Sequence, residues 1–387
     1  MWNRLAGERL LALRRRFPAV VVLGARQVGK TTLVRRALPE LPYCDLEEPG
    51  LRALFTVDPG YQIAARERGG LILDEVQAVP AVLEALRGLI DADRRRRGRF
   101  VLLGSAQPAL IRGVSESLAG RVGIVELDPL VAAEVSGGRR RRPWSRLWLH
   151  GGFPDAVDGD FREWWEAYLR TYVERDLPHL GVGADPLLLR RLLSMLAHQQ
   201  GGLFNASQLG GALGVSYHTV QRYVDVLEQT FLARRLPPFH RPLRKRLVKS
   251  PKVYLRDTGL LHHLLGISTL GELENHPIRG ASWETFVVEE LLRRERLAHP
   301  LTRASFFRTA TGLEADLVLE RDRRSFAVEV KAGSGRDPAA AERLGRCLED
   351  VGAEAGFVIA HQAGVEPLGP HLERRGFAAC VDWLPGD

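Results

Sequence analysis

PAVVVLGARQVGKTTLVRRAL, which spans residues 18–38, is the stretch that decides the fold of the first part of the chain. The apolar run from Val20 to Leu23 predicts a buried strand, and the residues from Thr31 to Leu38 predict a helix. Between them, Gly24 to Thr31 match the pattern G-x-x-x-x-G-K-[ST] in full. A strand, a glycine-rich loop and a helix in this order predict an α/β domain with a phosphate-binding loop.

The residue types of this loop suit a nucleotide bound with magnesium. Glycines let the backbone N–H groups curl around phosphates, and the following helix N-terminus adds positive potential. We expect the Lys30 ammonium to reach the β- and γ-phosphates and the Thr31 hydroxyl to ligate Mg²⁺. The predicted cofactors are therefore ATP and Mg²⁺. The expected binding residues of the loop are Gly24, Ala25, Arg26, Gln27, Val28, Gly29, Lys30, Thr31 and Thr32.

Two acidic residues follow another apolar strand of the same domain. The run Leu71 to Leu73 leads directly into Asp74 and Glu75. We expect Asp74 to hold the magnesium ion, directly or through water, and Glu75 to orient the attacking water. An acidic pair after a strand also marks the start of a helix. Downstream of a complete phosphate-binding loop, the catalytic interpretation is favoured.

Two further positions of this domain are candidates for catalysis. The strand from Phe100 to Leu103 is followed by Ser105 and Gln107, either of which would sit beside the γ-phosphate as a sensor residue. Arg121 stands just before an apolar strand and is expected to reach the ATP of a neighbouring subunit as an arginine finger. A solvated Arg121 is the alternative, because arginine is abundant in this chain.

The basic composition favours a polyanionic partner such as nucleic acid. The formal net charge is +8 and the isoelectric point is about 9.7. An arginine-rich source proteome is the alternative, because lysine supplies only 5 of the 55 basic residues. In such a chain a retained lysine indicates a need for its compact ammonium. The five lysines are Lys30, Lys245, Lys249, Lys252 and Lys331.

The sequence argues against secreted and membrane-spanning classes. No run approaches the roughly 18 apolar residues of a membrane span. The first 18 residues predict an amphipathic helix rather than a secretion signal. Three widely separated cysteines, Cys44, Cys347 and Cys380, fit neither a disulfide framework nor a zinc site. We expect a cytoplasmic protein with no membrane partner.

The region after residue 138 predicts the edge of the first domain and then a helical lid. The basic run from Arg139 to Arg142 predicts an exposed loop. Gly151-Gly152-Phe153-Pro154 resembles the element that opens the lid of a related ATPase group and packs near the adenine. A plain helix-entry turn is the alternative. The lid itself is predicted from Phe161 to Gln199.

The middle of the chain predicts a winged helix that binds DNA. Ala206 to Leu213 and Tyr217 to Gln229 predict two helices joined by a tight turn, as in a helix-turn-helix. The segment from Phe231 to Tyr254 resembles the wing, and its basic residues suit phosphate contacts. A protein-binding winged helix is the alternative. The expected DNA contacts are Tyr217, His218, Gln221, Arg222, Arg244, Lys245, Arg246 and Lys249. The other basic residues counted in the wing are Arg234, Arg235, Arg241 and Lys252.

The last third predicts a fold of the PD-(D/E)XK nuclease type. A helix from Ala281 to Arg296 carries Glu284, a later strand begins with Asp316, and the next strand ends in Glu329-Val330-Lys331. Asp316 and Glu329 are the expected ligands of a magnesium ion, and Lys331 shares a strand face with Glu329. All three are predicted catalytic residues. A DNA-binding platform that has lost cleavage is the alternative.

Six segments in order resemble a prokaryotic family of AAA-type ATPases with a C-terminal winged helix and a restriction-endonuclease-like domain. They are GARQVGKTTL, LILDEVQ, ESLAGRVGIVEL, YLRTYVERDL, SPKVYLRDTGLL and GLEADLVLE…AVEVKAG. The resemblance covers nearly the whole chain. It implies a phosphate-loop ATPase core at 1–150, a helical lid at 151–200, a winged helix at 201–265 and a nuclease-like α/β domain at 275–387.

These predictions combine into a DNA-binding, magnesium-dependent AAA-type ATPase. We expect a homo-oligomer, a hexameric ring, that moves or remodels duplex or branched DNA such as a four-way (Holliday) junction. Strand cleavage is left open. The alternative is a nucleotide-switched signalling or defence regulator whose C-terminal domains bind a protein partner.

Overall fold

The computed structural model describes residues 2–105, 113–114, 116–137, 141–177, 185–240 and 247–386, without the side chain of Ser105. The chain forms two compact units. The N-terminal unit comprises Asn3–Pro129 and Gln229–Phe231, and the C-terminal unit comprises Leu130–Glu228 and Leu232–Asp387 with the first two residues. The division after Pro129 lies inside the first predicted domain, 1–150.

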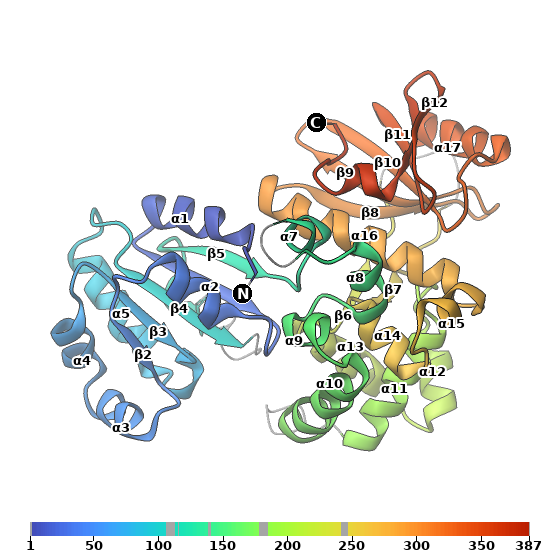
Figure 1. Ribbon diagram of the computed structural model, residues 1–387. Coiled ribbons are helices and arrows are strands. Elements are labelled where there is room, and N and C mark those ends of the chain that lie inside the picture. The colour runs from blue at the N-terminus through green and yellow to red at the C-terminus, as the bar shows by residue number, and fades with distance from the viewer. Residues whose placement is uncertain are drawn as a thin grey trace. The chain divides into compact units, whose positions relative to one another are not determined.

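The N-terminal unit is built on a parallel sheet with the strand order β2-β3-β4-β1-β5 (Figure 1). Its strands are β1 (Ala19–Gly24), β2 (Tyr43–Asp45), β3 (Leu71–Asp74), β4 (Phe100–Ser105) and β5 (Val122–Leu127). Strands β1 and β3 are buried along their whole length, as expected for parallel strands covered on both faces. Strand β4 separates β1 from β3, so the ends of all three meet at one edge of the sheet.

Helices cover both faces of this sheet. They are α1 (Ala6–Arg16), α2 (Lys30–Ala37), α3 (Pro49–Val57), α4 (Pro59–Arg66) and α5 (Ala81–Ala92), with a short 3-10 turn at Val76–Ala78. One face packs Phe55, Ile63 and Leu86 of α3, α4 and α5 against alternate strand residues such as Val21 and Leu73. Helices α1 and α2 contact each other and β1, and α1 also lies along β5. This two-sided burial fixes the edge at which the strand ends gather.

The first part of the C-terminal unit is helical. Its helices are α7 (Ala132–Ser136), α8 (Trp144–His150), α9 (Pro154–Asp158), α10 (Phe161–Tyr168), α11 (Pro186–His198), α12 (Ala206–Leu213) and α13 (Tyr217–Gln229). Helix α10 continues into a π-helix, Leu169–Asp176, a rare conformation that the sequence pattern did not indicate. The segment 132–150 belongs to this unit because buried groups tie it there. The backbone N–H of Ala132 donates to the Glu290 carboxylate, and the Trp148 indole donates to Ser282.

Helices α12 and α13 coincide with the predicted helix-turn-helix. Leu209, Val220 and Val224 are buried, as the apolar pattern predicts. Strands β6 (Ala233–Leu236) and β7 (Lys252–Leu255) then form an antiparallel hairpin. Where the structure describes the chain between these strands, that chain hydrogen-bonds to the C-terminal sheet and does not stand apart as a wing. The backbone N–H of Phe239 donates to Phe306, and that of Val248 donates to Arg308, on the first strand of the C-terminal sheet.

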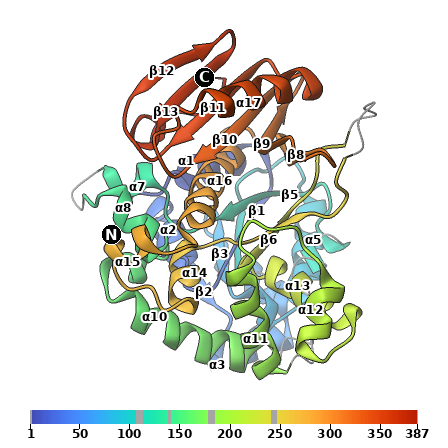
Figure 2. The same ribbon diagram turned by 90° about the vertical axis from the view of Figure 1, so that its right-hand side faces the viewer.

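The C-terminal sheet has the order β12-β13-β11-β10-β9-β8 (Figure 2). Its strands are β8 (Arg303–Arg308), β9 (Glu314–Arg321), β10 (Arg324–Lys331), β11 (Ala355–Ala360), β12 (Val365–Gly369) and β13 (Leu372–Gly376). The remaining helices of the unit are α14 (Thr258–Leu264), α15 (Leu270–Asn275), α16 (Arg279–Ala298) and α17 (Pro338–Val351), followed by a 3-10 turn at Phe377–Cys380. Helices α16 and α17 pack on opposite faces of the sheet (Figure 2). Strands β10 and β11 run parallel through the α17 crossover.

No helix in the described parts of the chain is both long and apolar enough to cross a membrane.

Candidate functional sites

The phosphate-binding loop connects β1 to α2, as predicted. A Cβ atom on Gly24 would lie 2.4 Å from the Leu127 carbonyl oxygen, so this position has no space for a side chain. The Arg4 guanidinium donates to the Val28 carbonyl oxygen at 3.0 Å and also to the carbonyl of Asp128. Arg4 therefore fixes the loop from outside, a role that the sequence pattern did not indicate. Arg26, Gln27 and Thr32 are exposed at the loop surface.

Lys30 is the first residue of α2, and its side chain folds back over the loop. Its Nζ atom donates to the carbonyl oxygens of Gly24 at 3.1 Å and Ala25 at 3.0 Å. Burial lowers the pKa of Lys30, while the nearby Glu75 and Asp74 carboxylates oppose that shift. The ammonium is thus held by neutral acceptors, beside but not bonded to the acids.

The Asp74 carboxylate is the centre of a hydrogen-bonded cluster at the end of β3. Its Oδ2 atom accepts from the Thr31 hydroxyl at 2.6 Å and from the Tyr43 hydroxyl at 2.8 Å. Its Oδ1 atom accepts from the backbone N–H of Glu75 at 2.9 Å. A hydroxyl and a carboxylate oxygen in direct contact fit the ligand set of a magnesium ion bound beside a phosphate loop. The predicted metal ligands Thr31 and Asp74 therefore lie together.

Tyr43 belongs to this cluster, and Glu47 lies within reach of the Glu75 and Asp74 charges; sequence reasoning missed both residues. Strand β2 is the neighbour of β3, which brings Tyr43 beside Asp74. Burial and its bond to Asp74 raise the pKa of Tyr43. Burial and then the Glu75 charge raise the pKa of Glu47. No local motif marks these residues, because their proximity depends on which strands pair.

Glu75 itself has a left-handed backbone conformation, with φ 50°, between β3 and the following turn. Its carboxylate accepts a hydrogen bond from the Gln77 side chain. The backbone of Ser105 lies in register with Gly24, at the end of the strand between β1 and β3. The side chain of Ser105 and all of Gln107 fall outside the described parts of the chain.

Arg121 lies at the opposite edge of the sheet from the phosphate loop. Val122 pairs with Ala19 at the start of parallel strands β5 and β1, whereas the loop follows the end of β1. The Arg121 guanidinium donates twice to the Asp91 carboxylate, at 2.8 Å from both Nε and Nη2. This pairing lowers the pKa of Asp91 to about 2. Arg121 cannot reach the nucleotide site of its own chain from this edge.

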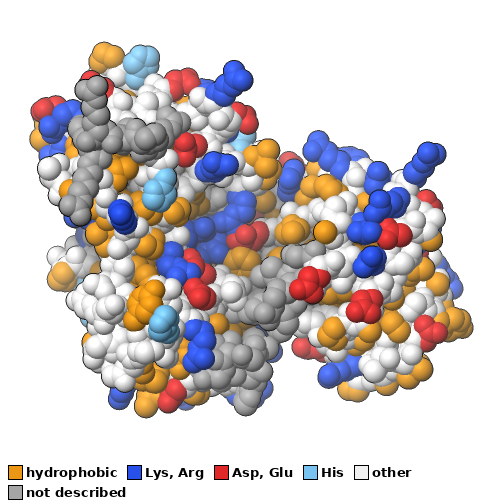
Figure 3. Space-filling view, turned by 180° about the vertical axis from the view of Figure 1, so that it is seen from behind, with side chains coloured by type: hydrophobic (Ala, Val, Ile, Leu, Met, Phe, Trp, Pro, Cys, Tyr) orange, Lys and Arg blue, Asp and Glu red, His pale blue; other side chains and the backbone are white. Residues whose placement is uncertain are grey.

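The predicted DNA contacts on α13 are accessible. Tyr217, His218 and Arg222 are exposed, and Gln221 is half-buried. Lys249 is also exposed, whereas Arg244, Lys245 and Arg246 fall outside the described residues. On the face shown in Figure 3, Lys and Arg side chains are interspersed with Asp and Glu.

The expectation that all of the hairpin's basic residues are available for phosphates is wrong. Arg234 pairs with the buried Glu289, and Arg235 pairs with Asp225 and Glu228. Lys252 is buried among three carboxylates. These cations neutralise acids of the same unit, so they do not add to a surface charge.

Lys252 lies inside the predicted nuclease site, which we call the acidic site. Its Nζ atom is 2.7 Å from a Glu314 oxygen, 3.0 Å from a Glu284 oxygen and 3.1 Å from Asp316 Oδ1. The Tyr254 hydroxyl donates to the same Glu284 oxygen at 2.7 Å. Sequence reasoning placed Lys252 on the wing, and it did not identify Glu314 at all.

The predicted metal ligands of the acidic site have other partners. Asp316 Oδ2 accepts from the backbone N–H of Val330 at 2.9 Å. Lys331 donates to Oε1 of Glu329, while Oε2 of Glu329 is buried without a hydrogen-bond partner in the described structure. Burial and the Asp316 charge raise the pKa of Glu329 to about 7. Burial is also the main reason why the pKa of Glu284 is raised to about 7.

The Gly-Gly-x-Pro element contacts α14 within its own unit. The backbone N–H of Gly152 donates to Asp257 Oδ2 at 2.8 Å, and a Cβ on Gly151 would lie 1.7 Å from Asp257 Oδ1. The other Asp257 oxygen caps α14 by accepting from Gly259. This contact accounts for the glycine at 151 without a nucleotide.

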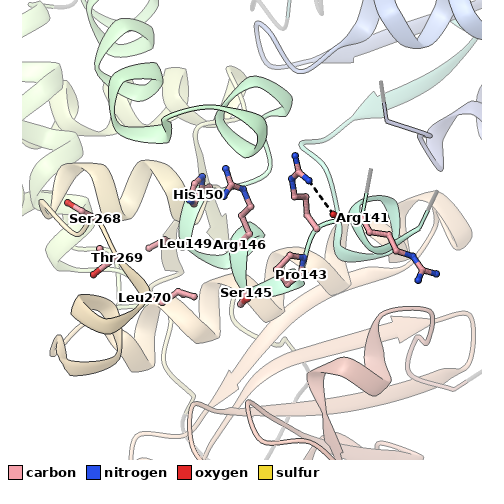
Figure 4. Close-up of a pocket in the computed structure, with 10 residues that line it drawn as sticks. Arg141, Pro143, Ser145, Arg146, Leu149, His150, Ser268, Thr269 and Leu270 are labelled. Carbon is pink, nitrogen blue, oxygen red and sulfur yellow. Dashed lines mark hydrogen bonds between the residues drawn. The ribbon is translucent and has the colours of Figure 1, made fainter. Parts of the chain in front are cut away.

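A basic pocket of about 620 Å³ opens between α8 and the start of α15 (Figure 4). Arg146 and His150 extend from α8 to the same side, while Arg141 points away from them (Figure 4). Arg146 already donates to the Val157 carbonyl oxygen at 2.7 Å, and Arg142 pairs with Asp158 at 3.4 Å. The pocket's arginines are therefore partly used within the fold, and the pocket contains none of the predicted site residues.

Three family models match successive parts of the chain. Residues 16–136 match an AAA domain. Residues 141–271 match a domain of unknown function (DUF8612), and residues 279–373 match another (DUF4143).

Curated relatives are themselves uncharacterized. Proteins of Mycobacterium tuberculosis and Mycobacterium bovis are each 40% identical over 339 residues, covering 86% of this chain and 74% of theirs. A Haemophilus influenzae protein is 26% identical over 254 residues, covering 60% of this chain and 59% of its own.

Solved structures resemble the chain weakly. A Walker-type ATPase of Pyrococcus abyssi aligns with 67% of this chain and 94% of its own, at 17% identity and a TM-score of 0.44. RuvB of Thermotoga maritima aligns with 60% of this chain and 87% of its own, at 21% identity and a TM-score of 0.32.

Proposed function

The chain belongs to the family of the uncharacterized mycobacterial proteins, with an AAA-type ATPase domain in its N-terminal unit, and from that premise we propose that it is a magnesium-dependent ATPase that remodels DNA. The observation that carries the proposal is the contact between the Thr31 hydroxyl and the Asp74 carboxylate at 2.6 Å, directly beside the phosphate loop.

The nucleotide site has a division of labour that suits hydrolysis. Thr31 and Asp74 would hold the magnesium ion, which supplies charge stabilisation to the phosphates when bound. Lys30 would exchange two neutral carbonyl acceptors for phosphate oxygens, which are stronger partners of an ammonium. Glu75, at the end of β3, is the candidate to orient the attacking water. Tyr43 keeps Asp74 in position through its hydroxyl.

Assembly of subunits would complete the site. Arg121 lies at the sheet edge opposite its own phosphate loop, so only a neighbouring chain's nucleotide could receive it. Its two bonds to Asp91 would first have to open, and this is a cost that assembly must offset, because the pair is bidentate and the Arg121 side chain is only 16% exposed. We therefore propose a homo-oligomeric ring in which assembly releases Arg121.

Helix α13 is the proposed DNA-contacting element. Tyr217, His218 and Arg222 are exposed on a helix that follows a tight turn, and such a helix can enter a major groove. Within the described residues, Arg222 has no acidic partner, in contrast to Arg234 and Arg235 of the hairpin. Arg222 is therefore the sharpest position at which to test DNA contact.

The deciding experiment measures ATP turnover without DNA and with single-stranded, duplex and four-way-junction DNA, using Lys30→Ala as the blank. We expect one DNA form to stimulate turnover. Arg222→Ala should reduce that stimulation and the salt dependence of binding. Arg87→Ala is the matched control, because it removes the same charge from an exposed position on α5 of the N-terminal unit. An ATP turnover rate that is the same with every DNA form as without DNA would overturn the DNA part of the proposal.

One observation favours a second candidate, a nucleotide-switched regulator whose C-terminal unit binds a protein. Three basic residues counted toward DNA binding instead neutralise acids of their own unit. This candidate requires slow turnover that is indifferent to DNA, and ATP-dependent changes in oligomeric state measured by light scattering.

A further inference from the structure

The acidic site raises a question that is separate from ATP hydrolysis: what balances its carboxylates. Glu284 comes from α16, whereas Glu314 and Asp316 come from β9, and each of them has an oxygen within 3.1 Å of one lysine Nζ atom. An ammonium has three N–H donors and no acceptor. The Lys252 ammonium thus lies among three carboxylates, two of which accept its hydrogen bonds, and its side chain is only 3% exposed.

A divalent cation does not fit among these groups as they stand. Magnesium requires about six oxygen ligands in near-octahedral geometry. Of the two predicted ligands, Asp316 uses one oxygen for Lys252 and the other for the backbone N–H of Val330. Glu329 uses one oxygen for Lys331. Within the described parts of the chain, no group of three His, Cys, Asp or Glu side chains is arranged to hold a metal ion.

Lys252 is built into this position by the backbone that carries it. Its strand pairs with β6 through Leu236, and Lys252 also forms a bridge with Leu203. Tyr254, two residues further on and therefore on the same strand face, donates to Glu284. Burial alone would lower the pKa of Lys252, but the Asp316 and Glu284 carboxylates raise it above its ordinary value. The residue is charged and held by the ladder rather than by a flexible loop.

The choice of lysine is itself informative in a chain with 55 basic residues, only 5 of which are lysines. A planar guanidinium directs its donors in a fixed fork, whereas an ammonium is a compact point charge with three donors. A point charge surrounded by three carboxylates from different directions is the electrostatic equivalent of a small cation.

We propose that the Lys252 ammonium takes the place of a divalent cation in the acidic site, so that the C-terminal unit binds no magnesium there and cleaves no DNA. The site instead ties the β6–β7 hairpin to α16 and to the C-terminal sheet. This inference does not depend on ATP hydrolysis, and its test uses no nucleotide.

The test measures Mn²⁺ binding to the full-length chain without nucleotide, by electron paramagnetic resonance, together with nicking of supercoiled plasmid. We expect the wild type not to nick the plasmid. We also expect Asp316→Asn to leave Mn²⁺ binding unchanged from that of the wild type. Lys252→Met, which removes the charge and keeps much of the volume, should bind Mn²⁺ about tenfold or more tightly than the wild type.

The wild type alone decides the question if Lys252→Met fails to fold. Mn²⁺ binding by the wild type that falls in Asp316→Asn or Glu329→Gln would overturn the proposal, as would metal-dependent nicking that is lost in Lys331→Ala. A folded Lys252→Met that gains no Mn²⁺ affinity would also count against it, because the three carboxylates would then not form a latent cation site.

Discussion

The two sites of this protein both place a buried lysine beside acidic residues, and they differ in what accepts the hydrogen bonds of that lysine. Lys30 donates to two neutral carbonyl oxygens of its own loop. The Asp74 carboxylate accepts hydrogen bonds from Thr31 and Tyr43 instead. Lys252 donates to the carboxylates of Glu284 and Asp316 and forms an ion pair with that of Glu314. A lysine held by carbonyls can turn to a phosphate at a net gain, whereas a lysine held by carboxylates is already neutralised. The first arrangement suits a ligand, and the second replaces one.

The largest expected effect that tests this contrast is on stability. Lys252→Met should lower the free energy of unfolding of the C-terminal unit by about 3–5 kcal/mol, because it leaves buried carboxylates without their counter-charge. All seven tryptophans, Trp2 included, belong to the C-terminal unit, so tryptophan fluorescence during denaturation reports on that unit. ATP turnover below the transition should be unchanged. A Lys252→Met variant as stable as the wild type would break the comparison.

The converse change should affect chemistry and leave the fold intact. Lys30→Ala should reduce ATP turnover by about 10²–10³-fold or more, since a preorganised charge at the phosphates is lost. The tryptophan-detected denaturation midpoint should stay where it is, because Lys30 belongs to the N-terminal unit. ATP turnover is measured as the rate of phosphate release at saturating ATP. Near-normal turnover of Lys30→Ala would show that the phosphate loop is not the site of ATP hydrolysis.

A matched pair of tyrosines gives the smallest and sharpest test. Tyr43 donates to Asp74 in one site, and Tyr254 donates to Glu284 in the other. Each hydrogen bond to a charged group is worth about 1.5–3 kcal/mol at most. Tyr43→Phe should lower turnover up to tenfold with little change in stability, and Tyr254→Phe should lower stability with no change in turnover. If both variants behave alike, the two sites do not have the separate roles assigned here.

Local sequence carried enough information for much of the fold. The helices at 206–213 and 217–229 are found at their predicted bounds, because Asn205 caps the first and Gly214 ends it in a left-handed conformation. The phosphate loop could be predicted equally well, because its strand, glycines and helix are contiguous in the sequence.

Contacts between distant segments could not be predicted in this way. Lys252 and Asp316 are 64 residues apart, and their contact requires knowing that the β6–β7 hairpin lies against β9. Tyr43 meets Asp74 only because β2 pairs with β3. From the sequence, the basic residues of the hairpin are predicted to lie on the surface. No local pattern shows that Glu289 and Glu228 lie opposite them.

The contact of Gly151 and Gly152 with Asp257 has a practical consequence for exchanging parts between family members. Two segments more than 100 residues apart depend on each other, because any side chain at 151 would collide with Asp257 and because Asp257 accepts the hydrogen bond from the backbone N–H of Gly152. A chimera cut between them would join halves that no longer match. The natural place to cut is therefore after Pro129, where the compact unit itself ends.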